Sequence, residues 1–162
     1  MKTIEVSVST SIACPAEQVW SLLGGFDLLP RWIDSIVSSR LDDGGRLRHL
    51  ELTDGAIIVE RLLEFSEGER HYSYALLEGP LPVSDYVGRV AVRDDGEGRT
   101  LATWSSRFRS EKANEVEIAT DLESFYRTGL ERLKVLSRSA AAGGHGGFMN
   151  ACKRGSRRTF SA

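Results

Sequence analysis

Apolar and polar residues alternate at the start of the chain, and this period of two predicts a half-buried β-strand over 4–12. Two short helices are expected next, over 15–23 and 27–32. Pro15 suits the first turn of a helix, because its fixed backbone angle is helical and no N–H is needed there. Asp27 can cap the second helix with its side chain. The chain is therefore predicted to begin with a strand and two helices.

Six further strands are predicted after the two helices. Each is a short run rich in apolar and β-branched residues, and most are followed by a glycine-bearing turn such as Thr53-Asp54-Gly55. Short turns join antiparallel neighbours, so the pattern indicates a meander. The expected strands cover roughly 35–42, 46–52, 56–65, 70–77, 83–93 and 99–109.

A long amphipathic helix is predicted over 114–138, where apolar residues recur at three- and four-residue spacing on one face. Gly129 lies within that face. A glycine inside a helix costs about 1 kcal/mol relative to alanine, so it makes room either for a closely packed strand or for a ligand, and both alternatives stay open. The face consists of Ile118, Leu122, Phe125, Gly129, Leu133 and Leu136.

The order of these elements indicates an α+β fold in which a seven-stranded, curved antiparallel sheet wraps around the long C-terminal helix. A curved sheet cannot cover its own concave face, and the helix supplies the second layer. Sheet and helix diverge at one end, so the architecture predicts a cavity between them. Residues 1–138 form this domain. Residues 139–162, rich in alanine, glycine and basic residues, are predicted to be a flexible tail.

Composition and charge narrow the class of protein. The 162 residues are 41% hydrophobic and 27% charged, and no stretch approaches the roughly 20 apolar residues of a membrane span. The net charge is −2, and the tail holds four basic residues and no acidic ones, so residues 1–138 carry −6. An acidic body is a poor platform for nucleic acid. Cys14 and Cys152 indicate no disulfide framework, so we expect a cytoplasmic protein.

Turn geometry predicts how the strands pair. If Thr53-Asp54-Gly55 is a three-residue loop with Gly55 in the left-handed conformation, Arg48 lies opposite Glu60. A two-residue loop would instead place Arg48 opposite Arg61, a destabilising pair of like charges. The three-residue loop is therefore preferred.

The same loop form at the next two glycine-bearing turns, with a connection centred on Pro80 between them, extends the pairing across the sheet. Glu60 then falls opposite Tyr74. Tyr86 falls opposite Tyr74 on one side and Trp104 on the other. The prediction is a polar and aromatic row on the concave face, made of Arg48, Glu60, Tyr74, Tyr86 and Trp104.

Two interpretations of this row stay open. Arg48 and Glu60 either satisfy each other as a buried ion pair, or anchor a polar group of an otherwise apolar ligand. Tyr74 and Tyr86 are either ordinary core tyrosines or hydroxyl donors and acceptors in a site. The candidate ligand contacts are Arg48, Ile58, Glu60, Tyr74, Leu76, Tyr86, Trp104, Leu122, Phe125 and Gly129.

Several motifs recur in the order and spacing of a known superfamily. Trp20 to Trp32 reads W-x5-F-D-x4-W, and Glu60-Arg61-Leu62, Gly79-Pro80-Leu81-Pro82 and Asp85-Tyr86 follow. With these motifs, residues 3–138 resemble the SRPBCC superfamily of START and birch-pollen-allergen proteins, in its polyketide cyclase/dehydrase and lipid-transport-like branch. The resemblance implies a helix-grip fold whose cavity binds hydrophobic small molecules. It also implies that some members catalyse polyketide cyclisation or dehydration.

Plant abscisic-acid receptors are more distant relatives, similar at Glu60-Arg61-Leu62 and in the spacing from there to a pocket tyrosine at Tyr86. This similarity implies that Glu60 and Tyr86 face the cavity. The carboxylate-binding lysine of those receptors falls on Val37, and their gate loop is shortened to Thr53-Asp54-Gly55-Ala56. Recognition of that hormone is therefore not expected.

No motif indicates a metal or a cofactor, and we predict neither. His49, His71 and His145 lack ligand spacing with the two cysteines, and we expect His49 and His71 at the surface. The chain has no phosphate-binding loop and no dinucleotide fingerprint.

Three functions are consistent with these residues. The first is binding of a hydrophobic small molecule such as a polyketide, an isoprenoid or a lipid-like compound. The second is a cofactor-independent cyclase, dehydratase or isomerase, in which Glu60 takes a proton and Arg48 or Tyr86 stabilises the enolate. The third is a regulatory domain whose basic tail engages an acidic partner. Ligand identity, turnover and oligomeric state stay open.

Overall fold

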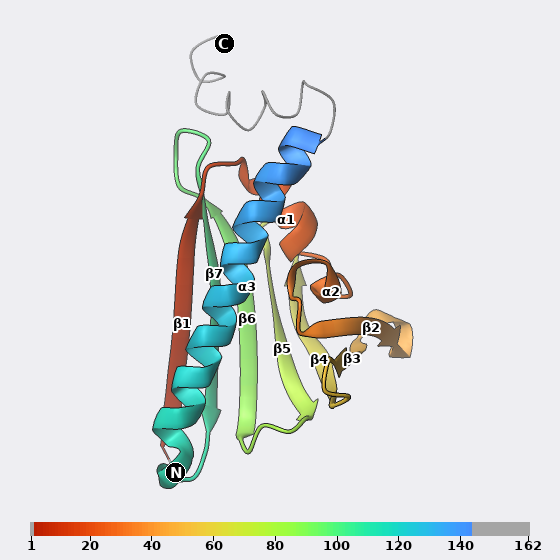
Figure 1. Ribbon diagram of the computed structural model, residues 1–162, viewed down its shortest axis with the longest axis vertical. Coiled ribbons are helices and arrows are strands. Elements are labelled where there is room, and N and C mark those ends of the chain that lie inside the picture. Colours follow the sequence, from red (N-terminus) through yellow and green to blue (C-terminus); the bar gives the residue numbers. More distant parts are fainter. Residues whose placement is uncertain (1, 144–162) are drawn as a thin grey trace.

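The computed structural model describes residues 2–143, which contain a seven-stranded sheet (Figure 1). All neighbouring strands are antiparallel, in the order β1-β7-β6-β5-β4-β3-β2. Every strand end lies within one residue of its prediction, and the expected seven-stranded antiparallel sheet is confirmed. The strands are β1 (Thr3–Ile12), β2 (Ile36–Asp42), β3 (Leu47–Leu52), β4 (Ile57–Ser66), β5 (His71–Glu78), β6 (Ser84–Asp94) and β7 (Thr100–Arg109).

Three α-helices accompany the sheet within the described residues: α1 (Ala16–Leu23), α2 (Leu29–Trp32) and α3 (Glu115–Gly143). α3 crosses one face of the sheet diagonally, and α1 and α2 lie on the same side (Figure 1). The buried face of α3 includes Ile118, Leu122 and Leu133, as the spacing predicted. α3 continues to Gly143, beyond the expected end at residue 138.

The caps of the short helices differ in detail from the prediction. Pro15 is the N-cap of α1 rather than its first helical residue. The N-cap of α2 is Leu28, and no side chain caps that helix, so the capping role expected for Asp27 is wrong. Pro30 lies in the first turn of α2, where its missing N–H costs no hydrogen bond.

The predicted pairing of β3 with β4 is confirmed. Gly55 has φ of +87° and closes a three-residue loop, in which the Leu52 N–H donates to the Ala56 carbonyl over 2.9 Å. Arg48 lies directly opposite Glu60. Glycine is needed in this loop because the left-handed region is open to it at little steric cost.

The other predicted pairings are wrong, because the remaining loops are longer than three residues. Glu60 lies opposite Leu76 rather than Tyr74, since Arg70, with φ of +58°, extends the β4–β5 loop. Gly88, not Tyr86, lies opposite Tyr74.

Between β6 and β7, Trp104 lies opposite Val90 instead of Tyr86. The loop there runs over 95–99 and contains Glu97, which also has positive φ. At Glu60, Tyr74 and Trp104 the slip is an even number of residues, because a β-bulge between Leu62 and Glu64 offsets one residue of the odd slip at the β4–β5 turn. Since side chains alternate with a period of two, an even slip leaves each side chain on its predicted face. The inward residues are therefore those predicted, although they form a staggered group instead of a straight row.

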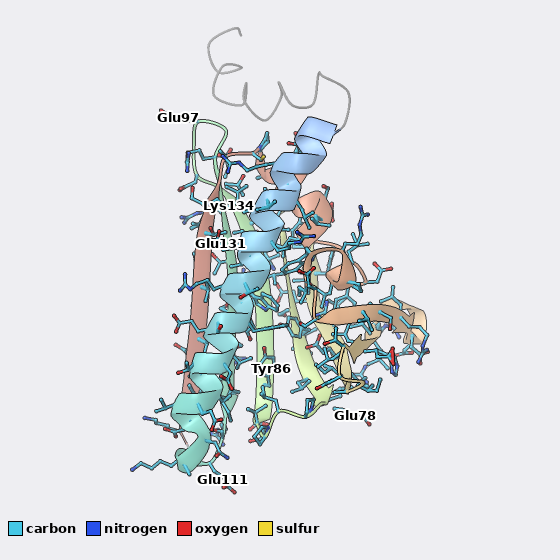
Figure 2. The ribbon with its side chains drawn as sticks, in the orientation of Figure 1. Glu78, Tyr86, Glu97, Glu111, Glu131 and Lys134 are labelled. Atoms are coloured by element: carbon cyan, nitrogen blue, oxygen red, sulfur yellow. The ribbon has the colours of Figure 1, made fainter. Side chains whose placement is uncertain are left out.

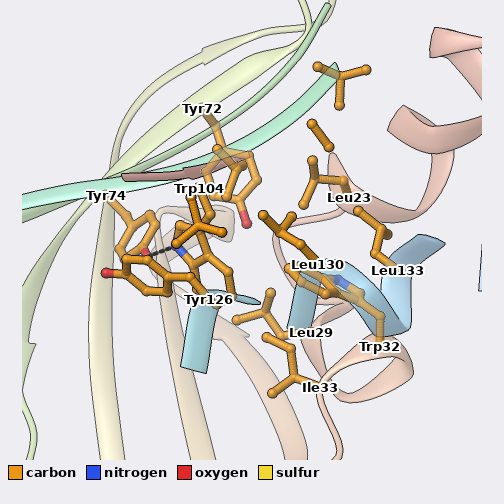
Figure 3. Close-up of a cluster of buried hydrophobic side chains, with 14 of the residues drawn as sticks. Leu23, Leu29, Trp32, Ile33, Tyr72, Tyr74, Trp104, Tyr126, Leu130 and Leu133 are labelled. Atoms are coloured by element: carbon orange, nitrogen blue, oxygen red, sulfur yellow. Dashed lines mark hydrogen bonds between the residues drawn. The ribbon is translucent and has the colours of Figure 1, made fainter. Parts of the chain in front are cut away.

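The core lies between the sheet and the three helices. Figure 3 shows a cluster to which α1 contributes Leu23, α2 contributes Trp32, β5 contributes Tyr72 and α3 contributes Leu130. All four side chains have 0% exposure. Trp32 and Trp104 of β7 pack edge to face, with ring centroids 5.4 Å apart. The part of the interior next to α1 and α2 is therefore densely packed and aromatic.

None of the helices in residues 2–143 combines the length and the apolarity that a membrane crossing requires. The part of the predicted tail from residue 144 onward, with Cys152 and His145, lies outside the described residues. The cytoplasmic location expected from the sequence stays a prediction.

Candidate functional site

A cavity of about 360 Å³ lies between the inner face of the sheet and the N-terminal half of α3. Its wall is formed by residues of strands β2 to β7, of α2 and α3, and of the β5–β6 connection at 79–81. Figure 2 shows Tyr86 on β6, beside α3. Most of the wall is apolar, and its aliphatic members include Leu50, Ile58, Leu76, Leu81 and Leu122.

Arg48 and Glu60 bring charge into this apolar wall. They share the inner face with Leu50 and Ile58 because each stands two residues away along its own strand. Arg48 Nε donates to Glu60 Oε1 over 2.7 Å, and the side chains are 1% and 10% exposed. A charge so far removed from water persists only when it is paired and hydrogen-bonded.

The guanidinium of Arg48 has further partners that hold it in place. Its Nη1 donates to the Phe26 carbonyl over 2.9 Å and to the Tyr72 hydroxyl over 3.1 Å. The rings of Phe26 and Tyr74 lie 4.2 and 4.7 Å from its central carbon, within cation–π range. Burial opposes the charge, but Tyr72 and Glu60 raise the pKa of Arg48 above its usual value. Arg48 is therefore a fixed cation.

Tyrosine hydroxyls form the second polar group of the cavity. Tyr86 and Tyr126 share a hydrogen bond through their hydroxyls. The Tyr74 hydroxyl accepts from Trp104 Nε1 over 2.9 Å, the contact drawn dashed in Figure 3. Burial raises the pKa of Tyr126 to about 12 and holds the pKa values of Tyr74 and Tyr86 well above the usual value. These hydroxyls are neutral at physiological pH and can orient a ligand oxygen, but they do not supply phenolate.

Gly88 permits this arrangement. A Cβ added at Gly88 would lie 2.2 Å from Cζ of Tyr74, closer than real Cβ contacts come. Tyr74 therefore lies over the bare backbone of β6, directly opposite Gly88 across the strand pair. Glycine within a strand often marks such a close approach.

Nine of the ten candidate ligand contacts line the cavity, and Gly129 does not. A Cβ at Gly129 would lie 3.1 Å from both Trp104 and Trp32. Of the two alternatives for Gly129, the structure therefore supports close packing, here against two tryptophan rings. The nine residues are Arg48, Ile58, Glu60, Tyr74, Leu76, Tyr86, Trp104, Leu122 and Phe125.

Several residues of the site were missed by the sequence reasoning. Tyr72 lies two residues before Tyr74 on the same face, so the period of two could have found it. Tyr126 lies four residues after Leu122 on α3, and helical spacing could have found it as well. Asp121 lines the cavity from an exposed position. The Phe26 carbonyl carried no signal, because a backbone acceptor depends only on where the chain passes.

Within residues 2–143, no group of three or more histidine, cysteine, aspartate or glutamate side chains is placed to hold a metal ion. His49 Nε2 lies 3.4 Å from Asp42 Oδ2 near the surface. His71 was expected at the surface, but it is only 9% exposed, with Nε2 3.1 Å from Glu69 Oε2. It lies outside the wall of the cavity.

Comparison with known proteins gives a consistent result. A family model described as polyketide cyclase/dehydrase and lipid transport matches residues 3–138. An uncharacterised protein from Bacillus thuringiensis is 36% identical with a TM-score of 0.79, and the match covers 83% of this chain and 98% of that one. The protein XoxI from Bacillus cereus is also 36% identical, with a TM-score of 0.78 and coverage of 82% and 94%.

A more distant structure establishes the fold class. The Zhui aromatase/cyclase from Streptomyces sp. R1128 is 16% identical, with a TM-score of 0.75 and coverage of 88% of this chain and 99% of that one. At that identity the likeness concerns the fold alone, and it confirms the expected helix-grip architecture. None of the curated proteins compared with this chain matches it.

Proposed function

Because the chain belongs to the polyketide cyclase/dehydrase and lipid transport family, we propose that it binds a mainly apolar small molecule between the sheet and α3. The observation that carries this proposal is the cavity of about 360 Å³ with its aliphatic and aromatic wall. Small-molecule sites usually combine such a wall with a few convergent polar groups. Polyketides, isoprenoids and lipid-like compounds have the matching chemistry.

The residues of the wall divide into two roles. Leu50, Ile58 and Leu122 supply affinity by covering apolar surface of the ligand. Glu60 and the hydroxyl of Tyr86 orient it, since each can form hydrogen bonds inside the cavity. Arg48 acts on the ligand through Glu60. It holds the Glu60 carboxylate in place with a hydrogen bond of 2.7 Å from Nε to Oε1.

The proposal is tested by filling the cavity. Ile58 lines it from β4, whereas Ile57, the preceding residue, points away and is 48% exposed. Ile58→Trp should weaken binding of the neutral fluorophore N-phenyl-1-naphthylamine by about tenfold or more, and Ile57→Trp should leave it unchanged. Both variants are first checked for folding by thermal melting. Equal affinity for the wild type and a folded Ile58→Trp would contradict the proposal.

One observation favours a second function, catalysis in the same cavity. Glu60 Oε1 accepts from Arg48, and no described group donates to Oε2, so this oxygen is available as a base. Tyr86 could then stabilise an enolate, in cyclase, dehydratase or isomerase chemistry. The test uses a ligand recovered by native mass spectrometry of protein from its own host. Glu60→Gln should retain binding of a neutral ligand but stop its conversion, and an unchanged rate would exclude Glu60 as the base.

The third hypothesis, an interaction through the basic tail, concerns residues outside the described part of the chain. It stays a prediction, and deletion of the tail tests it separately from the cavity.

A further inference from the structure

Three charged side chains line the cavity, and their summed formal charge is negative. Arg48 carries one positive charge, and Glu60 and Asp121 carry one negative charge each. The charge of Arg48 is already matched by Glu60, 2.7 Å away. Asp121 lies on the exposed side of α3 at the edge of the cavity. A ligand that enters therefore meets one carboxylate in excess and no unpaired cation among the described residues of the wall.

Glu60 presents a carboxylate oxygen without a donor to this wall. Its side chain is 10% exposed and lies in the wall, and no described group donates to Oε2. A carboxylate oxygen in an apolar cavity gains most from a hydroxyl or N–H donor. The remaining guanidinium nitrogen of Arg48, Nη2, also lacks a described partner. A ligand carboxylate that reached Nη2 would lie beside Glu60, and two carboxylates would share one guanidinium.

The hydroxyls of the wall cannot replace a second cation. Tyr74, Tyr86 and Tyr126 are neutral hydrogen-bonding groups, and two of them already bond to each other. They suit a carbonyl, ether or hydroxyl oxygen of a neutral ligand. In a site of low dielectric, an added anion costs far more than it would in water.

We propose that the cavity selects an uncharged, mainly apolar ligand that presents a hydroxyl or N–H donor to Glu60, and that it discriminates against carboxylates. This inference rests on the proposed function, because it concerns the same cavity. It narrows the ligand class to neutral compounds that carry a hydroxyl or an amide, and it excludes free carboxylic acids. Rejection of the wrong ligand comes from the net negative charge of the wall, in which the carboxylates of Glu60 and Asp121 share the single cation Arg48.

The experiment compares three naphthalenes of similar shape at pH 7.5 by displacement of N-phenyl-1-naphthylamine. 2-Naphthol carries a neutral donor, 2-naphthoate a carboxylate, and 2-methoxynaphthalene neither. The wild type should bind 2-naphthol at least about tenfold more tightly than 2-naphthoate, with 2-methoxynaphthalene between them. Equal or tighter binding of 2-naphthoate would overturn this inference and leave the proposed function intact. Failure of all three, and of the fluorophore, would overturn both.

Single variants test whether Glu60 and Asp121 cause the preference for 2-naphthol over 2-naphthoate. Glu60→Gln frees the charge of Arg48, so the preference for 2-naphthol should fall by about tenfold or reverse. Asp121→Asn lies at an exposed position, where folding is not at risk, and should lower the preference by about twofold to threefold. Glu117→Gln, one turn earlier on α3 and outside the wall, is the matched control and should change nothing. An unchanged preference in both Glu60→Gln and Asp121→Asn would overturn the inference.

Discussion

Arg48 Nε donates to Glu60 Oε1 over 2.7 Å, across strands β3 and β4, with the guanidinium almost completely removed from water. The pair lies at the boundary between the solid aromatic core and the cavity. Phe26 and Tyr72 bind the guanidinium from the core side, and Glu60 lines the cavity. The pair therefore connects the stability of the fold to the chemistry of the site.

Removal of one partner of this pair should lower the stability of the fold. Arg48→Met leaves Glu60 buried without its cation, so we expect a loss of about 3–5 kcal/mol in the free energy of unfolding. Urea denaturation measures it. The matched control is Arg40→Met, because Arg40 is 68% exposed and pairs loosely with Asp42 at 3.8 Å, and its loss should stay below about 1 kcal/mol. Similar losses in both variants would contradict the structural role of Arg48.

The double variant Arg48→Met with Glu60→Leu should recover most of that stability. It replaces both charges with apolar side chains, and a buried ion pair replaced as a whole is often neutral for stability. The recovered protein should still bind N-phenyl-1-naphthylamine, since the apolar wall is intact. A double variant as unstable as Arg48→Met would indicate that the packing of the arginine stem, not its charge, supports the fold.

Gly88→Ala should destabilise the protein by about 1–3 kcal/mol, because the new Cβ would lie 2.2 Å from the Tyr74 ring and force it to move. The displaced ring would also lose its hydrogen bond from Trp104, so tryptophan fluorescence should change. Gly68→Ala is the control, since Gly68 has no neighbour within 4 Å and its φ is not positive. A neutral Gly88→Ala would contradict the close approach of Tyr74.

Stability should fall at high pH. The pKa of Tyr126 is raised by burial to about 12, above its ordinary value near 10 in the unfolded chain. Between these values the folded state holds a proton that the unfolded state has lost, so the free energy of unfolding falls as pH rises. The contribution is complete below about pH 10 and is lost through about pH 12. Tyr74 and Tyr86 act in the same direction.

Urea unfolding at pH 8, 10 and 11 measures this decline. Tyr126→Phe should reduce its slope, because one of the titrating groups is then absent. Tyr86→Phe should act similarly, since Tyr86 is the hydrogen-bonding partner of Tyr126. A slope identical in the wild type and in both variants would show that other groups cause the decline.

Deletion of residues 144–162 should leave the affinity for N-phenyl-1-naphthylamine within about twofold of the full chain. The wall of the cavity described above lies wholly within residues 29–126. The full-length protein is measured beside the shortened one at the same salt concentration, because the tail carries charge. A loss of tenfold or more would indicate that the tail closes the site.

The sequence predicted the fold and the inward residues because both depend on short-range periodicity. Alternation placed Glu60, Tyr74 and Tyr86 on the inner face. This assignment survived loops of the wrong length because the slips at these residues are even, in β4 with the help of a β-bulge between Leu62 and Glu64. The β3–β4 pairing was predicted correctly since Gly55 supplies the positive φ that its loop requires. The other loops were misjudged because Arg70 and Glu97 adopt positive φ, which residues other than glycine rarely do.

The partners of the site residues were harder to predict than the residues themselves. Arg48 was expected to pair with Glu60, but its bonds to Phe26 and Tyr72 depend on how the connection between α1 and α2 lies against β5. Gly129 lay on the predicted inner face of α3, yet no pattern of spacing distinguishes a glycine that admits a tryptophan ring from one that admits a ligand. Such contacts arise from packing between elements far apart in the chain.

A crystal structure of the protein soaked with N-phenyl-1-naphthylamine tests the central claim most directly. We predict electron density for the compound between the sheet and α3, in contact with Ile58, Leu76 and Leu122 and beside Glu60. Density for the compound elsewhere, or a cavity filled by repacked side chains, would contradict the assignment of a small-molecule site to this interior.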